Sequence, residues 1–299
     1  MSEEWVLSAT MATNTANQED SGFGIVQALA QELSAGRVDL PSFPDAAARV
    51  QQAVSDPNST SERVARVVSA DAGLASRIIT MANSTLLHRG GDKVTDLKMA
   101  ITRIGYQHVR TAALAYASAQ LRRAPELKHL RPDLEKCWKE SIRVAALTNA
   151  IARESQRVRS DEAMLAGLMH NIGKVYIIAR VPPDSPVMRD PVRKEQLVME
   201  WYPSIGQALI ENWNLPEEIA IAVGGQCDLE RNHIGPPDMQ DLLIVAVALV
   251  AQMGNGARGE DNTISELHAA KLLGLDDSAM VRVMLESQTD LEMLNAALG

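Results

Sequence analysis

One short stretch of the sequence carries the residue types of a metal-binding site. Residues 162–175 read EAMLAGLMHNIGKV, and apolar residues recur on one helical face before His170. A histidine beside a short polar side chain, followed by Gly173 and Lys174, has the form of a metal-site segment, but the neighbour here is the uncharged Asn171. We predict that the helix runs through His170 and Asn171 and ends near Gly173, because glycine readily forms a helix C-cap.

Other catalytic chemistry finds little support in the sequence. Cys137 and Cys227 lie far apart, without a CxxC motif or a nearby histidine, and we expect both to be reduced core residues. There is no Gly-x-Ser-x-Gly motif and no Walker-type or Rossmann-type glycine loop. The remaining histidines show no ligand spacing, and they are His88, His108, His129, His233 and His268.

The elements that must position residues 162–175 are predicted to be helices. Aromatic residues make up only 3% of the chain, which disfavours a sheet because Phe, Tyr and Trp are strong strand formers. Helix signals recur from Ile25 onward, and the segment from Leu134 to Glu154 is apolar on two sides, as expected of a central helix. No segment has a convincing strand pattern, so the predicted fold class is all-α.

The prolines and the polar N-terminus suggest how the chain is divided. Residues 1–21 are polar and without periodicity, and we predict a disordered tail. Pro125 and Pro132 bracket a short hinge-like region between helical patterns. We therefore predict an N-terminal helical lobe over residues 22–128 and a C-terminal helical lobe over residues 129–299.

Charge and hydropathy limit the classes of partner. The formal net charge is −9, which argues against a general binder of nucleic acid or of anionic membranes. Between Arg103 and Arg131 the only acidic residue is Glu126, and we expect a solvated basic face there, with a docking site for an acidic partner as the alternative. The apolar run from Leu242 to Met253 is shorter than the roughly 20 residues of a membrane span. No signal peptide precedes the helices, so we expect a cytoplasmic protein.

Four segments, in order, resemble the HDOD family, signalling domains related to the HD phosphohydrolases. They are Leu40–Pro44 (LPSFP), Asp71–Ser84 (DAGL to MANS), Ala100–Gly105 (AITRIG) and Ala166–Lys174 (AGLMHNIGK), with Ala72 in place of the family's proline. The resemblance covers residues 34–254 and implies two lobes, an N-terminal bundle specific to the family and an HD-like C-terminal bundle.

The resemblance also implies where the metal ligands of an HD enzyme would lie. Such enzymes hydrolyse phosphate esters with a divalent metal held by several His and Asp side chains. His170 alone keeps its ligand type, and the other matching positions are Glu140, Asn171, Tyr202 and Gln226. The distal Asp expected within residues 242–253 is missing. Because His170 and Glu140 are too few to hold a catalytic metal, we expect a polar, metal-free core without catalytic residues or cofactor.

Three functions follow from these observations. The first is a catalytically inactive bacterial signalling output or adaptor module that acts through contacts with other signalling proteins, as a monomer or homo-oligomer. The second is a sensor of a small ligand such as a nucleotide, bound in the vacated metal pocket, and the third is a residual metal-dependent phosphohydrolase. The candidate ligand or partner contacts are Asn83, Ser84, Arg103, Ser141, Gly173 and Lys174.

Overall fold

The computed structural model describes residues 22–35, 45–84, 92–182, 185–255 and 264–298. Within these ranges the chain forms helices and no strand, which confirms the all-α prediction. The predicted tail, the LPSFP segment, the loop up to Gly91 and most of the glycine-rich stretch 254–259 lie outside the described residues.

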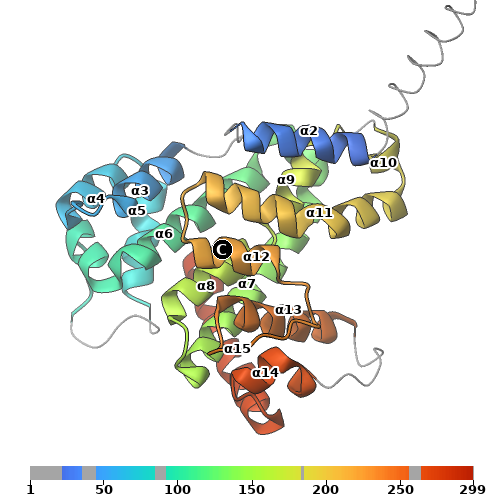
Figure 1. Ribbon diagram of the computed structural model, residues 1–299. Coiled ribbons are helices and arrows are strands. Elements are labelled where there is room, and N and C mark those ends of the chain that lie inside the picture. Colours follow the sequence, from blue (N-terminus) through green and yellow to red (C-terminus); the bar gives the residue numbers. More distant parts are fainter. Residues whose placement is uncertain (1–21, 36–44, 85–91, 183–184, 256–263, 299) are drawn as a thin grey trace, which may run out of the picture.

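The helices follow one another as shown in Figure 1. Their bounds are α2 Gly22–Ser34, α3 Asp45–Ser55, α4 Ser61–Val68, α5 Ala72–Ala82, α6 Leu97–Arg123, η1 Pro125–Leu130, α7 Arg131–Ser155, α8 Ser160–Met169, α9 Ile172–Arg180, α10 Pro186–Arg189, α11 Pro191–Asn212, α12 Glu217–Gly224, α13 Met239–Asn255, η2 Ile264–Glu266, α14 His268–Leu272 and α15 Asp277–Leu298.

A smaller core joins α3, α4, α5 and the first part of α6, at the left in Figure 1. Three of these helices begin at a side chain that accepts a hydrogen bond from a free backbone amide, namely Thr60, Asp71 and Asp96. The fully buried side chains of this core include Val64, Leu74, Ile78 and Ile101.

The long helix α6 connects the smaller core to a larger one. It is interrupted at Gly105, whose φ of 77° and ψ of 165° are not helical, so α6 consists of two helical stretches that meet at this glycine. Beyond this kink, Leu114 and Leu121 of α6 reach the larger core.

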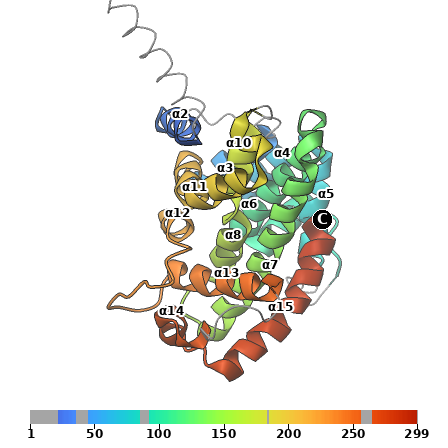
Figure 2. The ribbon, with the colours of Figure 1, turned by 90° about the vertical axis from the view of Figure 1, so that its right-hand side faces the viewer.

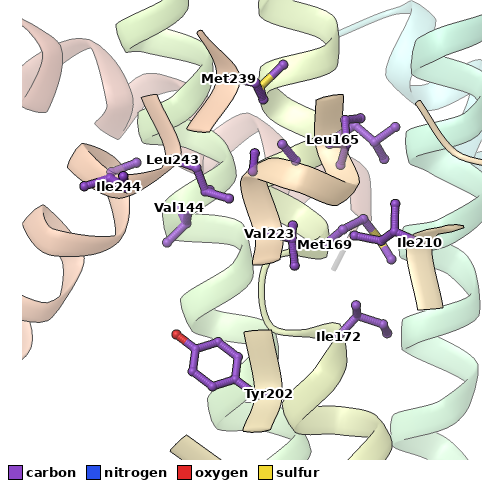
Figure 3. Close-up of a cluster of buried hydrophobic side chains, with 14 of the residues drawn as sticks. Val144, Leu165, Met169, Ile172, Tyr202, Ile210, Val223, Met239, Leu243 and Ile244 are labelled. Carbon is purple, nitrogen blue, oxygen red and sulfur yellow. The ribbon is translucent and has the colours of Figure 1, made fainter. Parts of the chain in front are cut away.

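The larger core lies among α7, α8, α9, α11, α12 and α13, whose buried side chains converge in Figure 3. The first residues of the apolar run in α13, including Leu242 and Leu243, are fully enclosed there, whereas Met253 at its end is exposed. None of the described helices combines the length and the apolar character that crossing a membrane requires.

The two hydrophobic cores do not coincide with the two predicted lobes. Helix α2 falls within the predicted N-terminal lobe, but Val26, Leu29 and Leu33 pack into the larger core, where α2 lies over α11 (Figure 1). The predicted hinge is the turn η1, whose Leu127 and Leu130 are buried in the larger core. The domain boundary at residue 128 therefore stays a prediction, with α2 as the helix that departs from it.

The last helix, α15, contacts both cores. Figure 2 shows α15 running beside α7, with its C-terminal end approaching α5. Val283 packs into the larger core and Leu294 into the smaller one. Between them the buried Asp290 accepts a hydrogen bond from Asn149 at 3.0 Å and pairs with Arg153 at 2.8 Å, which fixes α15 along α7.

Candidate functional site

The His-Asn pair lies in a tight turn between two helices. Helix α8 ends at Met169 and α9 begins at Ile172, so His170 and Asn171 form the connection. The predicted helix end near Gly173 is wrong, because Gly173 lies inside α9. A Cβ atom at Gly173 would stand 2.0 Å from the backbone oxygen of Tyr202, so glycine allows α9 to pack closely against α11.

His170 is buried, with 3% of its surface exposed, and is held by the backbone. Its Nδ1 lies 2.7 Å from the carbonyl oxygen of Gly167. A carbonyl only accepts, so Nδ1 carries the proton and Nε2 keeps the free lone pair. Burial, and less strongly the nearby charge of Lys174, lower the pKa of His170 to about 3, so the ring is neutral at physiological pH.

Asn171 and Lys174 both contact the same carboxylate. The Asn171 Nδ2 donates to Glu140 Oε2 at 3.1 Å, and the Lys174 Nζ lies 3.7 Å from that oxygen. The Lys174 ammonium also lies 4.5 Å from the centre of the Tyr202 ring. A lysine of the chain itself therefore supplies positive charge beside Glu140, the one acidic residue among the positions that match the HD ligands.

Gln226 and Tyr202 complete the set of matching positions. The Gln226 Nε2 donates to the carbonyl oxygens of His170 at 3.0 Å and of Val223 at 2.8 Å. The Tyr202 hydroxyl lies 3.0 Å from Cys227 Sγ, and burial raises the pKa of Tyr202. Cys227 itself is exposed, unlike the core residue expected from the sequence. The five positions are thus linked by contacts, directly or through one neighbour.

This set of donors does not fit a catalytic metal ion. Asn171 Oδ1 and Gln226 Oε1 are buried without a hydrogen-bond partner, but both are neutral amide oxygens, as the His170 ring is neutral. The one carboxylate, Glu140, already contacts an ammonium group. A divalent cation at this position would meet the Lys174 charge and find little anionic charge to offset it.

The described residues gather metal-type ligands in a different place. Ligand atoms of His233, Asp238 and Asp241 all lie within 4.8 Å of one another. The prediction that the remaining histidines are scattered is thus wrong for His233, and the H-x4-D-x2-D spacing was the missed signal. Arg231 contacts Asp241 and lies 2.7 Å from Asp238, so a guanidinium already neutralises these carboxylates and fixes the loop before α13.

Three of the other four candidate contacts have local partners away from this turn. Asn83 donates to Val94 O and accepts from Val94 N, both at 2.8 Å, and so ties the end of α5 to residue 94. The Ser84 hydroxyl donates to Met81 O at 2.7 Å, and Arg103 Nη2 donates to Asp92 O at 3.1 Å. Ser141 is buried beside a void of about 20 Å³ that also adjoins Asn171. Ser141 alone of these four thus lies at the His-Asn turn, and their role as contacts stays a prediction.

A groove opens beside the turn, between α7, α9 and α11. Its volume is about 270 Å³, and Glu140 and Lys174 lie in its wall. Cys137 lines it as well, and burial raises the pKa of this thiol to about 11. The other charged lining residues balance one another and are Asp133, Lys136, Lys194 and Glu195.

The predicted basic face is only partly solvated. Arg122 is buried, with its guanidinium 4.1 Å from the centre of the Trp138 ring and its Nε 3.4 Å from Glu135. Burial lowers the pKa of Arg122 to about 10, despite the nearby Glu135. Arg110 is buried too. The prediction of a solvated face is therefore wrong for these two arginines.

Several solved structures share this fold. A protein from Shewanella amazonensis SB2B, provisionally named a metal-dependent phosphohydrolase, has 23% identity and a TM-score of 0.71 over 93% of this chain and 99% of that chain. An HDOD domain protein of unknown function from Geobacter sulfurreducens has 21% identity and a TM-score of 0.62 over 90% and 96%. A Marinobacter aquaeolei VT8 protein, provisionally named a signal transduction protein, has 22% identity and a TM-score of 0.58 over 94% and 66%.

Sequence comparison gives one further relative and the family. An uncharacterised protein of Treponema pallidum (strain Nichols) is 20% identical over 196 residues, and the match spans 36% of that protein's length and 60% of this chain. The model of the HDOD domain matches residues 40–227, more than half of the chain and including the turn between α8 and α9. The chain therefore belongs to the HDOD domain family.

Proposed function

We propose that this protein is a signalling module that acts through contacts with other proteins and does not hydrolyse phosphate esters. The observation that carries the proposal is the position of Lys174, whose ammonium stands 3.7 Å from Glu140. In an HD phosphohydrolase a metal would supply that charge, polarise the phosphate and activate water. A lysine side chain supplies charge alone.

The neutral side chains around Glu140 support the same conclusion. His170 is held neutral by burial, and Asn171 and Gln226 are amides that face a buried interior. Replacing a charged ligand by a neutral one removes the need for a metal to balance it. Membership of the HDOD family supports a signalling role. The provisional name of the Marinobacter relative agrees with that role. The provisional name of the Shewanella relative favours phosphohydrolase activity instead.

The enzymatic part of the proposal is tested by metal content and hydrolysis. We expect purified protein to hold less than stoichiometric Mn, Fe, Ni or Zn, and to leave phosphomonoesters and cyclic dinucleotides intact when these ions are added. His170→Ala serves as the control, because hydrolysis that disappears in this variant would assign the activity to the buried turn and refute the proposal.

The protein-contact part is tested by affinity capture from the protein's own cells, with quantitative mass spectrometry. Charge reversal by Arg103→Glu, in α6, is compared with Arg157→Glu on an exposed residue before α8. A partner lost with Arg103→Glu and kept with Arg157→Glu would support a docking surface that includes Arg103. Capture of no reproducible partner by the unaltered chain would count against the adaptor function.

A small-ligand sensor is the second candidate function. The void of about 20 Å³ beside Asn171 has room for a single water and is too small for a nucleotide. The groove of about 270 Å³ beside Lys174 offers more space. Stabilisation by a nucleotide in a thermal-shift screen, lost in Lys174→Ala, would favour this function.

A further inference from the structure

A larger pocket, separate from the groove beside Lys174, lies between the smaller core and the beginning of α8. Its volume is about 510 Å³, within the range of small-molecule sites. The walls come from α3, α4 and α6 of the smaller core and from the beginning of α8, which α6 adjoins in Figure 1. The polar lining includes Ser61, Thr102, Gln107, Arg110 and Arg159.

Arg110 is the unusual residue of this cavity. Only 7% of it is exposed, yet its two hydrogen-bond partners are neutral: Nη1 donates to Gln107 Oε1 and Nη2 to Ser55 Oγ, both at 3.1 Å. Its Nε is buried without any hydrogen-bond partner. A guanidinium has five N–H donors and stays protonated in proteins. Within the described residues no carboxylate lies at ion-pair distance, so a buried positive charge lacks a direct counter-ion.

The nearby acids do not fill this role. Asp161 lines the same cavity, but both of its oxygens accept from Arg159, at 2.8 and 3.3 Å. Glu162 lies one side chain away from Arg110, because Gln107 stands between them and reaches Glu162 Oε1 at 3.5 Å. Burying an arginine without a paired anion is unfavourable, and such charges are normally paired or ligated.

We propose that this cavity binds a small molecule carrying an oxyanion, a phosphate or carboxylate group that pairs with Arg110. The guanidinium fork matches either group with two parallel hydrogen bonds. Arg159 is exposed at the rim and can rotate from Asp161 to meet the same ligand. Tyr106, Ile101 and Val54 add apolar surface for the rest of the molecule.

Occupancy of the cavity would bear on the proposed signalling function, on which this last step rests. Arg159 and Asp161 stand at the start of α8, and α8 ends at the His170 turn. A ligand there would bridge the smaller core and α8. Binding itself is measured on the purified chain, so it can fail or succeed independently of any protein partner.

The test is isothermal titration calorimetry of the full chain with pyrophosphate, AMP and citrate at constant ionic strength. We expect one of the three to bind, and its identity separates a phosphate from a carboxylate ligand. Arg110→Met should abolish binding, and Arg159→Ala should weaken it about tenfold, as expected for one charge-assisted hydrogen bond. Arg157→Ala, an exposed arginine that does not line the cavity, and Lys174→Ala, in the separate groove, should bind as the unaltered chain does.

The stability of Arg110→Met separates a ligand site from a purely structural arginine. Removing an unpaired buried charge should leave the melting temperature of the ligand-free protein unchanged or higher. Thr102 lies at an exposed position of the cavity wall, so Thr102→Trp should block the site from outside and abolish binding. This second variant tests the proposal if Arg110→Met does not fold. Failure of all three compounds to bind at millimolar concentration, or binding that survives both Arg110→Met and Thr102→Trp, would overturn the proposal.

Discussion

His170, a residue type that can bind metal ions, is held in this protein as a neutral, buried side chain. Burial lowers its pKa to about 3, whereas an unfolded chain titrates histidine near 6.5. Between these values the unfolded state binds more protons than the folded state, so the free energy of unfolding falls as the pH falls. Above pH 6.5 the stabilisation is fully present. When the pH is lowered from 7 to 5, we expect protonation of His170 in the unfolded chain to reduce the free energy of unfolding by about 2 kcal/mol.

Urea unfolding at pH 7, 6 and 5 measures this effect. In His170→Gln the loss of stability over this interval should shrink by about 2 kcal/mol, whatever the variant costs at pH 7. His129→Gln is the matched control, since His129 is exposed. His108 is a further source of pH dependence, because burial lowers its pKa too. An unchanged pH dependence in His170→Gln would show that the ring is not held neutral.

The sequence predicts the residues of the site better than it predicts their contacts. The matching positions Glu140, Asn171, Tyr202 and Gln226 are implied by the resemblance to the HDOD family, and in the structure these side chains lie near one another. Two other features depend on packing between helices that are distant in sequence. They are the contact of Lys174 with Glu140 and the burial of Arg110 without a counter-ion. Periodicity gives the buried face of a helix, but not which charged side chain ends beneath a neighbouring helix.

Close packing of helices α9 and α11 depends on one glycine. A Cβ at Gly173 would stand 2.0 Å from Tyr202 O and 2.8 Å from Gly206 N, and both are backbone atoms that no rotamer change can move. Gly173→Ala must therefore push the helices apart, and we expect a loss of about 3 kcal/mol in the free energy of unfolding. Chemical denaturation at pH 7 measures it.

Gly254 in α13 provides the opposite case on another helix. A Cβ there meets no atom within 4 Å, and Gly254→Ala should stabilise the protein by about 0.5 kcal/mol through helix propensity. A similar small gain in Gly173→Ala would mean that α9 and α11 do not touch as described.

Helix boundaries show where local sequence rules stop being sufficient. The cap at Asp71 and the break at Gly105 follow from side-chain chemistry and backbone freedom, and both are present. The predicted end of the HD helix near Gly173 fails, because glycine serves there as a small residue for packing and not as a cap. Local sequence cannot distinguish these two uses of glycine, since the partner backbone comes from α11.

At the scale of the whole molecule, two cores are joined by helices that run through both. Helices α6 and α7 contribute side chains to each core, and α15 packs Val283 into the larger and Leu294 into the smaller. A perturbation of either core is therefore expected to reach the other through the connecting helices. This linkage is what a signalling module needs if an event at one surface is to alter another.

Leu294→Ala tests the linkage. Leu294 is 1% exposed, and its truncation should cost about 3 kcal/mol. Leu285→Ala, on the same helix but 68% exposed, should change stability by less than about 0.5 kcal/mol. Hydrogen exchange then reports where protection is lost. If the cores unfold together, Leu294→Ala lowers protection in α11–α13 as well as in α3–α5, because the same global opening exposes both. Loss confined to α3–α5 would mean that the smaller core opens alone and that α15 only rests against it.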